Sequence, residues 1–325
     1  MHISFAEFFV DPYSKEPLLL EIFEKNGDQI KEGILKNKDS FYFIKGGIPR
    51  FITGSDNYAN SFGFQWGKWP RVQFESENIG KPMEGHTRKM FDTITANSIE
   101  HVKKDDVILD IGCGAGRFID VVRMKCDNPI IGIDYSNSVE IAYNNFISDQ
   151  KICIVQADAL KLPFRPGAFQ GSFSIGVLHH TPDPEKGVKE AFRVLDKGGW
   201  FGLSVYQKNS YYDKPVLKFY RKIFSYLKPL FSFMPAILYS YVVVNVFRSV
   251  ARRLVFIKSI TSKCFPFVDL PDKNWSILDT FDSVTPTYAS TYKREEVFDW
   301  LCAAGFQDNK PTNWGETSFL ARKLD

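Results

Sequence analysis

Three glycines at alternate positions have the spacing that most clearly suits ligand binding in this sequence. Gly112, Gly114 and Gly116 follow an apolar run at 107–110 and precede a helical pattern at 118–123. Because glycine has no Cβ, it lets the backbone turn sharply and approach a ligand closely. The GxGxG spacing differs from the dinucleotide-binding GxGxxG, and no GK[ST] follows to hold a nucleotide phosphate. The pattern predicts a ligand-binding loop of another kind.

Acidic side chains stand at the ends of three successive apolar runs. Asp110 ends the first run, Asp134 ends the second, and Asp158 follows the third. The two acceptor oxygens of a carboxylate can bind two hydroxyl groups, which suits Asp134 for a sugar. We expect Asp110 to orient the glycine loop by accepting backbone N–H bonds, and Cys113 to be a small space-filling residue rather than a nucleophile. Asp158 has two interpretations, a ligand contact or a helix cap.

Two histidines and a tyrosine are the candidates for moving a proton. His179 and His180 follow an apolar run at 169–175, and Tyr206 ends another at 200–206. Histidine titrates near neutral pH and suits a general base. The alternative is that His179 packs beneath a ligand while His180 caps the next helix. Both interpretations stay open, with His180 the preferred base.

Alternating strands and helices must position these residues. Strands are expected at 107–110, 129–134, 152–156, 169–175, 200–206 and 318–322, and helices at 138–147, 184–194 and 293–304. Strand–helix alternation of this kind predicts a mostly parallel sheet with helices on both faces. The expected fold class is therefore α/β, a doubly wound Rossmann-like sheet.

Four segments are expected along the chain. Residues 1–55 contain short apolar strands separated by turn formers, which predicts a small β-rich unit. Residues 56–206 form the Rossmann-like core, residues 207–275 a helical insert, and residues 276–325 complete the sheet.

The segment 107–118 resembles motif I of class I S-adenosylmethionine-dependent methyltransferases. The resemblance covers roughly residues 85–206, and the segments 176–183 and 191–199 are similar to those of ubiquinone- and menaquinone-type small-molecule methyltransferases. It implies that the glycine loop holds the amino-acid end of S-adenosylmethionine, that Asp134 binds both ribose hydroxyls, and that Asp158 meets the adenine amino group. Tyr135 and Ala159, which follow these two acids, are expected at the same cofactor site.

Two further cofactor contacts follow from the resemblance. The aromatic stretch 62–69, with Trp66, is similar to an entry segment that covers the cofactor, although a plain hydrophobic helix is the alternative. Arg88 is a candidate for holding the cofactor carboxylate.

The N-terminal unit resembles a zinc-ribbon-like domain, but Asp11 and Ser14 stand where cysteines would bind the metal. We expect no metal there.

The insert is basic and partly apolar. Residues 207–263 contain eleven Lys or Arg and one acid, and the stretch 229–247 has no charge. Three interpretations are open: a cap over the substrate with its apolar side facing a hydrophobic acceptor, a membrane-surface segment, or a transmembrane helix. Arg248, Arg252 and Arg253 share one side of a helix, where they would meet an anionic acceptor or an anionic membrane.

The composition of the chain limits the range of possible functions. The net charge of the 325 residues is only +3, which argues against nucleic-acid binding. The five cysteines are odd in number and no pair is spaced as CxxC, and no signal peptide is visible. A cytoplasmic protein is therefore expected. Peripheral membrane contact through 207–263 is an option. The expected activity is methyl transfer from S-adenosylmethionine to an oxygen, nitrogen or carbon of a small-molecule, sugar, quinone-like or lipid-linked acceptor. The alternatives are an RNA-base methyltransferase and a catalytically inactive cofactor-binding subunit, and the oligomeric state stays open.

Overall fold

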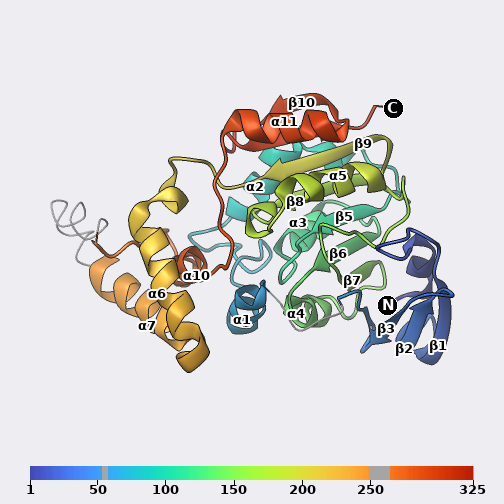
Figure 1. The fold of residues 1–325 in the computed structure, drawn as a ribbon, viewed down its shortest axis with the longest axis horizontal. Coiled ribbons are helices and arrows are strands. Elements are labelled where there is room, and N and C mark those ends of the chain that lie inside the picture. Colours follow the sequence, from blue (N-terminus) through green and yellow to red (C-terminus); the bar gives the residue numbers. More distant parts are fainter. Residues whose placement is uncertain (53–57, 249–263, 325) are drawn as a thin grey trace.

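The computed structural model describes residues 1–52, 58–248 and 264–324. Its centre is a seven-stranded sheet of order β10-β11-β9-β8-β5-β6-β7 (Figure 1). The five strands from β9 to β7 run parallel, whereas β11 is antiparallel to both β9 and β10. The expected doubly wound α/β fold is therefore confirmed. The strands are β5 (Ile108–Ile111), β6 (Ile130–Asp134), β7 (Ile152–Gln156), β8 (Phe169–Ile175), β9 (Leu195–Ser204), β10 (Gln307–Pro311) and β11 (Ser318–Arg322).

Helices cover both faces of this sheet, as the strand–helix alternation requires. Because side chains alternate along a strand, Ile108 of β5 belongs to one buried cluster and Leu109 to the other. The cluster containing Ile108 packs under α2 (His86–Thr95) and α3 (Arg117–Lys125), while that of Leu109 packs under α5 (Pro184–Val194) and α11 (Arg294–Ala304). The sheet is thus rigidly held between two hydrophobic layers.

Local signals set several helix ends. Asp183 accepts a hydrogen bond from the Lys186 N–H at 3.1 Å, and Pro184 occupies the first turn of α5, which is the usual capping chemistry. The helix α2 ends at Thr95, because Ala96 and Asn97 both adopt positive φ. The helix α4 (Ser138–Asn145) begins at Ser138.

The N-terminal unit is an antiparallel meander of β1 (Leu19–Asn26), β2 (Gln29–Lys36), β3 (Phe41–Lys45) and β4 (Ile48–Pro49) after a short helix, η1 (Ile3–Phe8). It shares one hydrophobic core with the large sheet, because the Phe9 ring lies 5.4 Å from Phe51 and 5.6 Å from Phe164. The backbone N–H of Phe51 also donates to the Gln156 carbonyl at 2.8 Å. The unit is therefore packed firmly onto the core.

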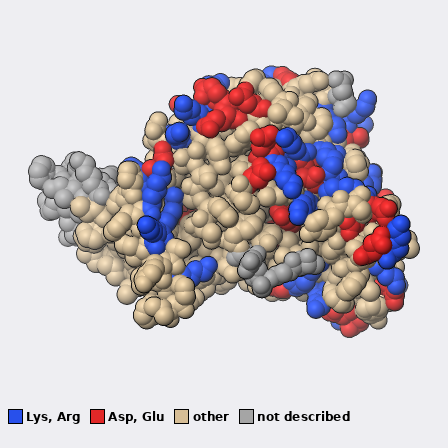
Figure 2. Space-filling view, viewed as in Figure 1, with Lys and Arg blue, Asp and Glu red and all other residues tan. Residues whose placement is uncertain are grey.

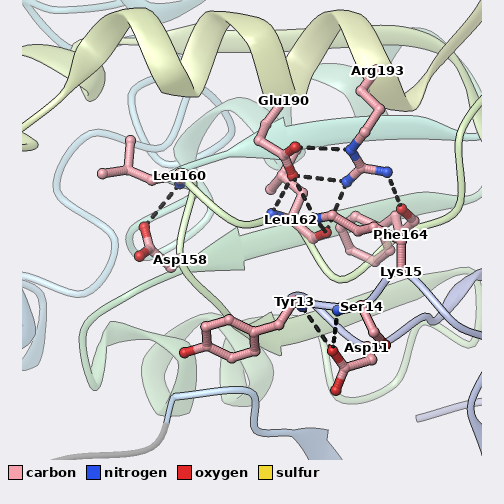
Figure 3. Close-up of polar contacts among 10 residues, drawn as sticks. All are labelled: Asp11, Tyr13, Ser14, Lys15, Asp158, Leu160, Leu162, Phe164, Glu190 and Arg193. Carbon is pink, nitrogen blue, oxygen red and sulfur yellow. Dashed lines mark hydrogen bonds and ion pairs between the residues drawn. The ribbon is translucent and has the colours of Figure 1, made fainter.

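An ion-pair network fastens the same junction (Figure 3). Lys15 of the N-terminal unit lies 3.1 Å from the Glu190 carboxylate of α5, and Glu190 also pairs with Arg193 at 2.8 Å. Arg193 donates to the carbonyl oxygens of Phe164 and Leu162. Glu190 and Arg193 are mostly buried, so these contacts fix the orientation of the unit more firmly than exposed pairs would.

Asp11 is the polar centre of the N-terminal unit. Its Oδ1 accepts the backbone N–H groups of Tyr13 and Ser14 at 2.8 and 2.7 Å, and its Oδ2 accepts the hydroxyls of Ser40 and Tyr42. Burial alone would raise the pKa of Asp11, but these hydrogen bonds outweigh it and hold the pKa at about 2. A hydrogen-bonded carboxylate thus joins the turn at residues 13–14 to the beginning of β3.

Asp11→Ala should lower the free energy of unfolding by about 1–3 kcal/mol, because four donors lose their shared acceptor. The folded-state pKa of Asp11 is depressed, so its stabilisation is present above pH 4 and is lost as the pH falls from about 4 to about 2. Urea unfolding across this range measures both effects, with Asp39→Ala, an exposed neighbour, as the control.

Metal analysis should find no stoichiometric zinc; one zinc per chain would contradict this role for Asp11.

The insert is helical, as expected, but its uncharged stretch is not one helix. Residue Ser232, at φ 53°, separates α6 (Pro215–Phe231) from α7 (Met234–Val242), which continues into a π-helical turn, η5 (Val243–Phe247). Within the described residues, every helix is too short or too polar to traverse a bilayer. The transmembrane interpretation is therefore not supported there.

Three further features of the insert differ from what the sequence predicts. The apolar sides of α6 and α7 pack on α10 (Lys273–Val284) and form a cluster with Phe281, so they do not face the central cavity described below. The boundary expected at 275/276 falls inside α10. Arg248 is mostly buried and pairs with Asp269 at 3.1 Å, whereas Arg252 and Arg253 lie outside the described residues. The three arginines thus give no evidence of a shared basic surface.

Candidate active site

A cavity of about 390 Å³ lies at the carboxyl ends of the parallel strands, where ligands bind in open α/β sheets. The loops after β5, β6, β7, β8 and β9 line it on one side, and α1 (Asn60–Lys68) and α10 close it on the other. Ten of the residues expected at the site line this cavity: Trp66, Gly112, Cys113, Gly114, Asp134, Tyr135, Ala159, His179, His180 and Tyr206.

The glycine loop has the geometry that only glycine tolerates. Gly112, Gly114 and Gly116 have φ values of 87°, 55° and 97°, in a region that other residues rarely adopt. The indole of Trp66 lies directly over Gly114, where an added Cβ would come within 2.7 Å of its Nε1. Gly116 faces the Phe146 ring behind the loop and does not line the cavity. The Cys113 thiol is buried and its pKa is raised well above the usual value by that burial, as suits a space-filling side chain.

Asp134 anchors the loop and faces the cavity. Its Oδ2 accepts the Gly114 N–H at 3.0 Å, and its Oδ1 accepts the N–H and hydroxyl of Ser136 at 2.8 and 2.7 Å. Burial raises the pKa of Asp134, although the bonds from Ser136 and Gly114 oppose this. The carboxylate also lines the cavity, where it can meet a ligand hydroxyl.

Asp110 does not orient the loop as expected. The loop N–H groups of Gly112 and Cys113 instead donate to the Ile133 carbonyl at 2.8 Å. The Asp110 carboxyl is buried outside the cavity lining with Oδ2 unpartnered. Burial and the neighbouring Asp134 raise its pKa well above the usual value, although Arg117 opposes this.

Asp158 and Arg88 are not brought to the cavity. The Oδ1 of Asp158 accepts the Leu160 N–H at 2.8 Å in a local turn (Figure 3), and no helix begins among the described residues between β7 and β8, so Asp158 is not a helix cap either. Arg88 is exposed on α2. Arg117, the residue directly after the glycine loop, lines the cavity instead and donates to Gln73 Oε1 at 2.7 Å. Its position next to GxGxG was the signal that could have identified it.

The two histidines have different free nitrogens. His180 Nδ1 lies 2.7 Å from the Tyr288 carbonyl; since a carbonyl can only accept, Nδ1 carries the proton and Nε2 is a free acceptor. His179 Nδ1 accepts the Tyr206 N–H at 3.2 Å, so its proton is on Nε2, which has no partner. Burial lowers the pKa of both rings, although Asp282 and the Tyr288 carbonyl oppose this for His180. Both are therefore neutral at pH 7, and only His180 presents a basic nitrogen.

The ring of Tyr206 stacks on two other rings, and its hydroxyl group contacts a carboxylate. Its ring lies 3.6 Å from His179 and 3.7 Å from Tyr212, and its hydroxyl donates to Asp282 at 3.1 Å. Burial raises the pKa of Tyr206 well above 10, and Asp282 raises it further. Tyr206 is therefore a neutral part of the wall and a poor proton acceptor.

The wall from α10 is acidic, which the sequence analysis missed. Asp279 and Asp282 both line the cavity, and Asp279 accepts a hydrogen bond from Gln73 at 2.9 Å. Burial raises the pKa of Asp279 to about 7, and Asp282 contributes to this shift while Arg117 opposes it. No motif surrounds these acids in the sequence, so only the packing of α10 could reveal them.

Residues 109–203 match the family described as “Methyltransferase domain”. The matched segment runs from β5 to β9 and includes the glycine loop, Asp134 and both histidines. Together with the fold, this match defines a class I S-adenosylmethionine-dependent methyltransferase domain, and the chain carries one. S-adenosylmethionine is the cofactor that such a domain implies.

Individual relatives share this domain only. The human “Probable tRNA methyltransferase 9B” is 35% identical over 123 residues, which are 36% of this chain and 25% of that protein. The 24-methylenesterol C-methyltransferase 2 of Arabidopsis thaliana is 26% identical over 158 residues, 47% of this chain and 43% of that protein. This chain thus spans about a quarter of the length of the first relative and under half of the second.

One solved structure covers more of the chain. It is an N-methyltransferase of Haemonchus contortus in complex with phosphomonomethylethanolamine and S-adenosylhomocysteine, 14% identical, with a TM-score of 0.47. The superposition covers 83% of this chain and 48% of that one.

Proposed function

We propose that this protein transfers a methyl group from S-adenosylmethionine to a small-molecule or lipid-linked acceptor, with His180 as the general base. The observation that carries the proposal is the shared cavity: the glycine loop, Asp134 and His180, whose Nε2 is free, all line it. A methyltransferase must bring its cofactor and its proton acceptor together in this way.

The residues present fit the cofactor. Asp134 lines the cavity and can accept from a ribose hydroxyl, and Tyr135 and Ala159, which also line the cavity, would meet the adenine. At the methionine side, Gln65 Oε1 is buried without a partner and can accept from the ammonium group. Arg117 keeps guanidinium donors for the carboxylate, the role first expected of Arg88.

When bound, S-adenosylmethionine supplies an activated methyl group on sulfur. The protein's own task is to orient the acceptor atom and take up its proton as the new bond forms. His180 Nε2 accepts that proton, while the bond from Nδ1 to the Tyr288 carbonyl fixes the tautomer and stabilises the resulting imidazolium. The ring of Phe62, 4.8 Å away, holds the imidazole in position.

The cavity wall favours an acceptor with hydrogen-bond donors and an apolar body. The rings of Tyr206 and Tyr212 provide a flat apolar surface, and Asp279 and Asp282 provide acceptors beside it. Such acids would attract a hydroxyl or amine and repel a phosphate. This supports a small-molecule acceptor of an O- or N-methyl transfer over a nucleic acid.

Asp134→Ala should weaken S-adenosylmethionine binding by about 1–3 kcal/mol, the range for losing hydrogen bonds to a charged group. Calorimetry measures this, and thermal unfolding checks that the loop remains folded. Asp158→Ala is the matched control: its side chain bonds its own turn outside the cavity, so it should change affinity by less than about threefold. Unchanged affinity in Asp134→Ala would refute the ribose contact.

A tRNA base is the second candidate acceptor, because the human relative's name includes tRNA. Incubating the protein and methyl-labelled S-adenosylmethionine separately with bulk tRNA and with a lipid and small-molecule extract distinguishes the two. Label in the extract supports the proposal, and label in tRNA alone supports the second candidate. Cofactor binding without label in either would favour an inactive subunit.

A further inference from the structure

The insert exposes an unusually apolar surface on the side of α6 and α7 away from the cavity. Large hydrophobic side chains project from both helices and from the turn between them, and each is more than half exposed. They are Phe219, Tyr226, Leu230, Phe231, Met234 and Leu238. Monomeric proteins rarely expose so many apolar side chains together unless the surface binds something.

The same helices carry only positive charge. Residues 214–248 contain six Lys or Arg and no acid. Figure 2 shows Lys and Arg as a blue stripe on the otherwise tan surface of this end of the molecule, whereas the rest of that face mixes both signs. An apolar face with a basic border is the pattern of a helix that lies on an anionic membrane.

A second cavity, of about 230 Å³, opens between α6, α7 and residues 285–287. Arg221, Lys222 and Lys228 line it together with Ser225 and Ser232, and no carboxylate is among its lining residues. Three cations and two hydroxyls around a small cavity form a suitable binding site for a phosphate group.

The cations of this cavity retain free donors. Arg221 donates through Nε to the Ser283 carbonyl at 2.8 Å, but its Nη2 is buried with no partner. Lys228 lies 4.9 Å from the Phe233 ring centre, and burial lowers its pKa. A buried donor without a partner is unfavourable, so a bound anion would stabilise this arrangement.

We propose that the α6–α7 surface binds anionic phospholipid membranes, with its Lys side chains at the lipid phosphates and its exposed apolar side chains among the acyl chains. The exposed apolar side chains distinguish membrane binding from nucleic-acid binding. A nucleic acid would contact the positive charges but would not bury exposed Leu230 and Leu238. The inference stands apart from the methyl-transfer proposal, since it involves no residue of the active-site cavity.

Sedimentation with vesicles tests the proposal on the full chain. The protein should sediment with mixed phosphatidylcholine–phosphatidylglycerol vesicles, fail to sediment with pure phosphatidylcholine vesicles, and be released by salt. Lys222→Gln/Lys228→Gln should weaken partitioning by about fivefold per charge removed. Leu230→Gln/Leu238→Gln should weaken it by tenfold or more, on the order of the loss for two buried leucines.

Matched variants keep the test specific. Lys25→Gln/Lys38→Gln and Leu19→Gln/Ile147→Gln remove exposed charges and apolar groups elsewhere, and neither should change vesicle binding. Calorimetry with inorganic phosphate distinguishes a free phosphate from a lipid phosphate. The Leu230→Gln/Leu238→Gln variant should still bind inorganic phosphate but should sediment much less with vesicles. The proposal is overturned if the wild type ignores anionic vesicles, if it binds only free phosphate or tRNA, or if the leucine variant binds vesicles like the wild type.

Discussion

His180→Asn should lower kcat by about 10²–10⁴-fold, the usual contribution of a general base, while S-adenosylmethionine affinity stays within a factor of about two. An asparagine amide can still donate to the Tyr288 carbonyl, so the loop after β8 should keep its conformation. What the variant loses is the Nε2 lone pair. The assay measures methyl transfer to the acceptor identified by the extract experiment, and cofactor affinity is measured separately by calorimetry.

The pH profile separates a base from a structural residue. Burial lowers the pKa of His180 below its usual 6.5, so the part of the kcat/KM profile that depends on this ring should fall only below pH 6.5, as the ring becomes protonated. His180→Asn should abolish this acidic limb. His179→Asn should retain it, because His179 Nδ1 is already occupied by the Tyr206 N–H. An unchanged acidic limb in His180→Asn would exclude this residue as the base.

Several parts of the site could be predicted because their chemistry is local in the sequence. The GxGxG loop, the acid ending β6 and the histidines after β8 lie at strand ends, and parallel strands bring those ends to one edge. The backbone alone then places Gly112, Asp134 and His180 together. The family match over 109–203 covers the same residues.

Other parts depend on contacts between distant segments and could not be predicted. Asp279 reaches the cavity only because α10 folds back from the insert, and its partner Gln73 is 206 residues away. Asp158 follows β7 by two residues, close to the same sheet edge as Asp134, yet its carboxylate turns to the nearby Leu160 N–H. Sequence position defines which residues stand near the site, but the competing local hydrogen bonds decide where each side chain points.

The edge strand β10 was missed for a different reason. Its residues, Gln307–Pro311, are polar and largely exposed, so the alternation of apolar and polar residues that predicts strands is absent. It forms only because β11 presents an unpaired edge, and a proline is tolerated there because no further strand follows.

Gly112→Ala should abolish most cofactor binding and destabilise the fold by about 2–5 kcal/mol. Two effects add up. At φ 87°, a Cβ adds backbone strain of about 1–2 kcal/mol. The new methyl group would also lie 2.3 Å from Val177 Cγ1 and 2.5 Å from its Cγ2, an overpacking that costs about 1–3 kcal/mol. Since both loops line the cavity, any shift that relieves the contact also moves the cofactor site.

The Gly198→Ala variant separates the effect of backbone strain from that of the steric contact with Val177. Gly198 has a similar φ of 75°, but an added Cβ would meet nothing within 4 Å, so this variant should lose only the backbone contribution and bind S-adenosylmethionine normally. Adding Val177→Ala to Gly112→Ala should restore part of the stability and affinity by making room for the methyl group. Urea unfolding and calorimetry measure the set. If Gly112→Ala is no less stable than Gly198→Ala and binds the cofactor like the wild type, the glycine loop is an ordinary turn, and the cofactor site must be sought elsewhere along the sheet edge.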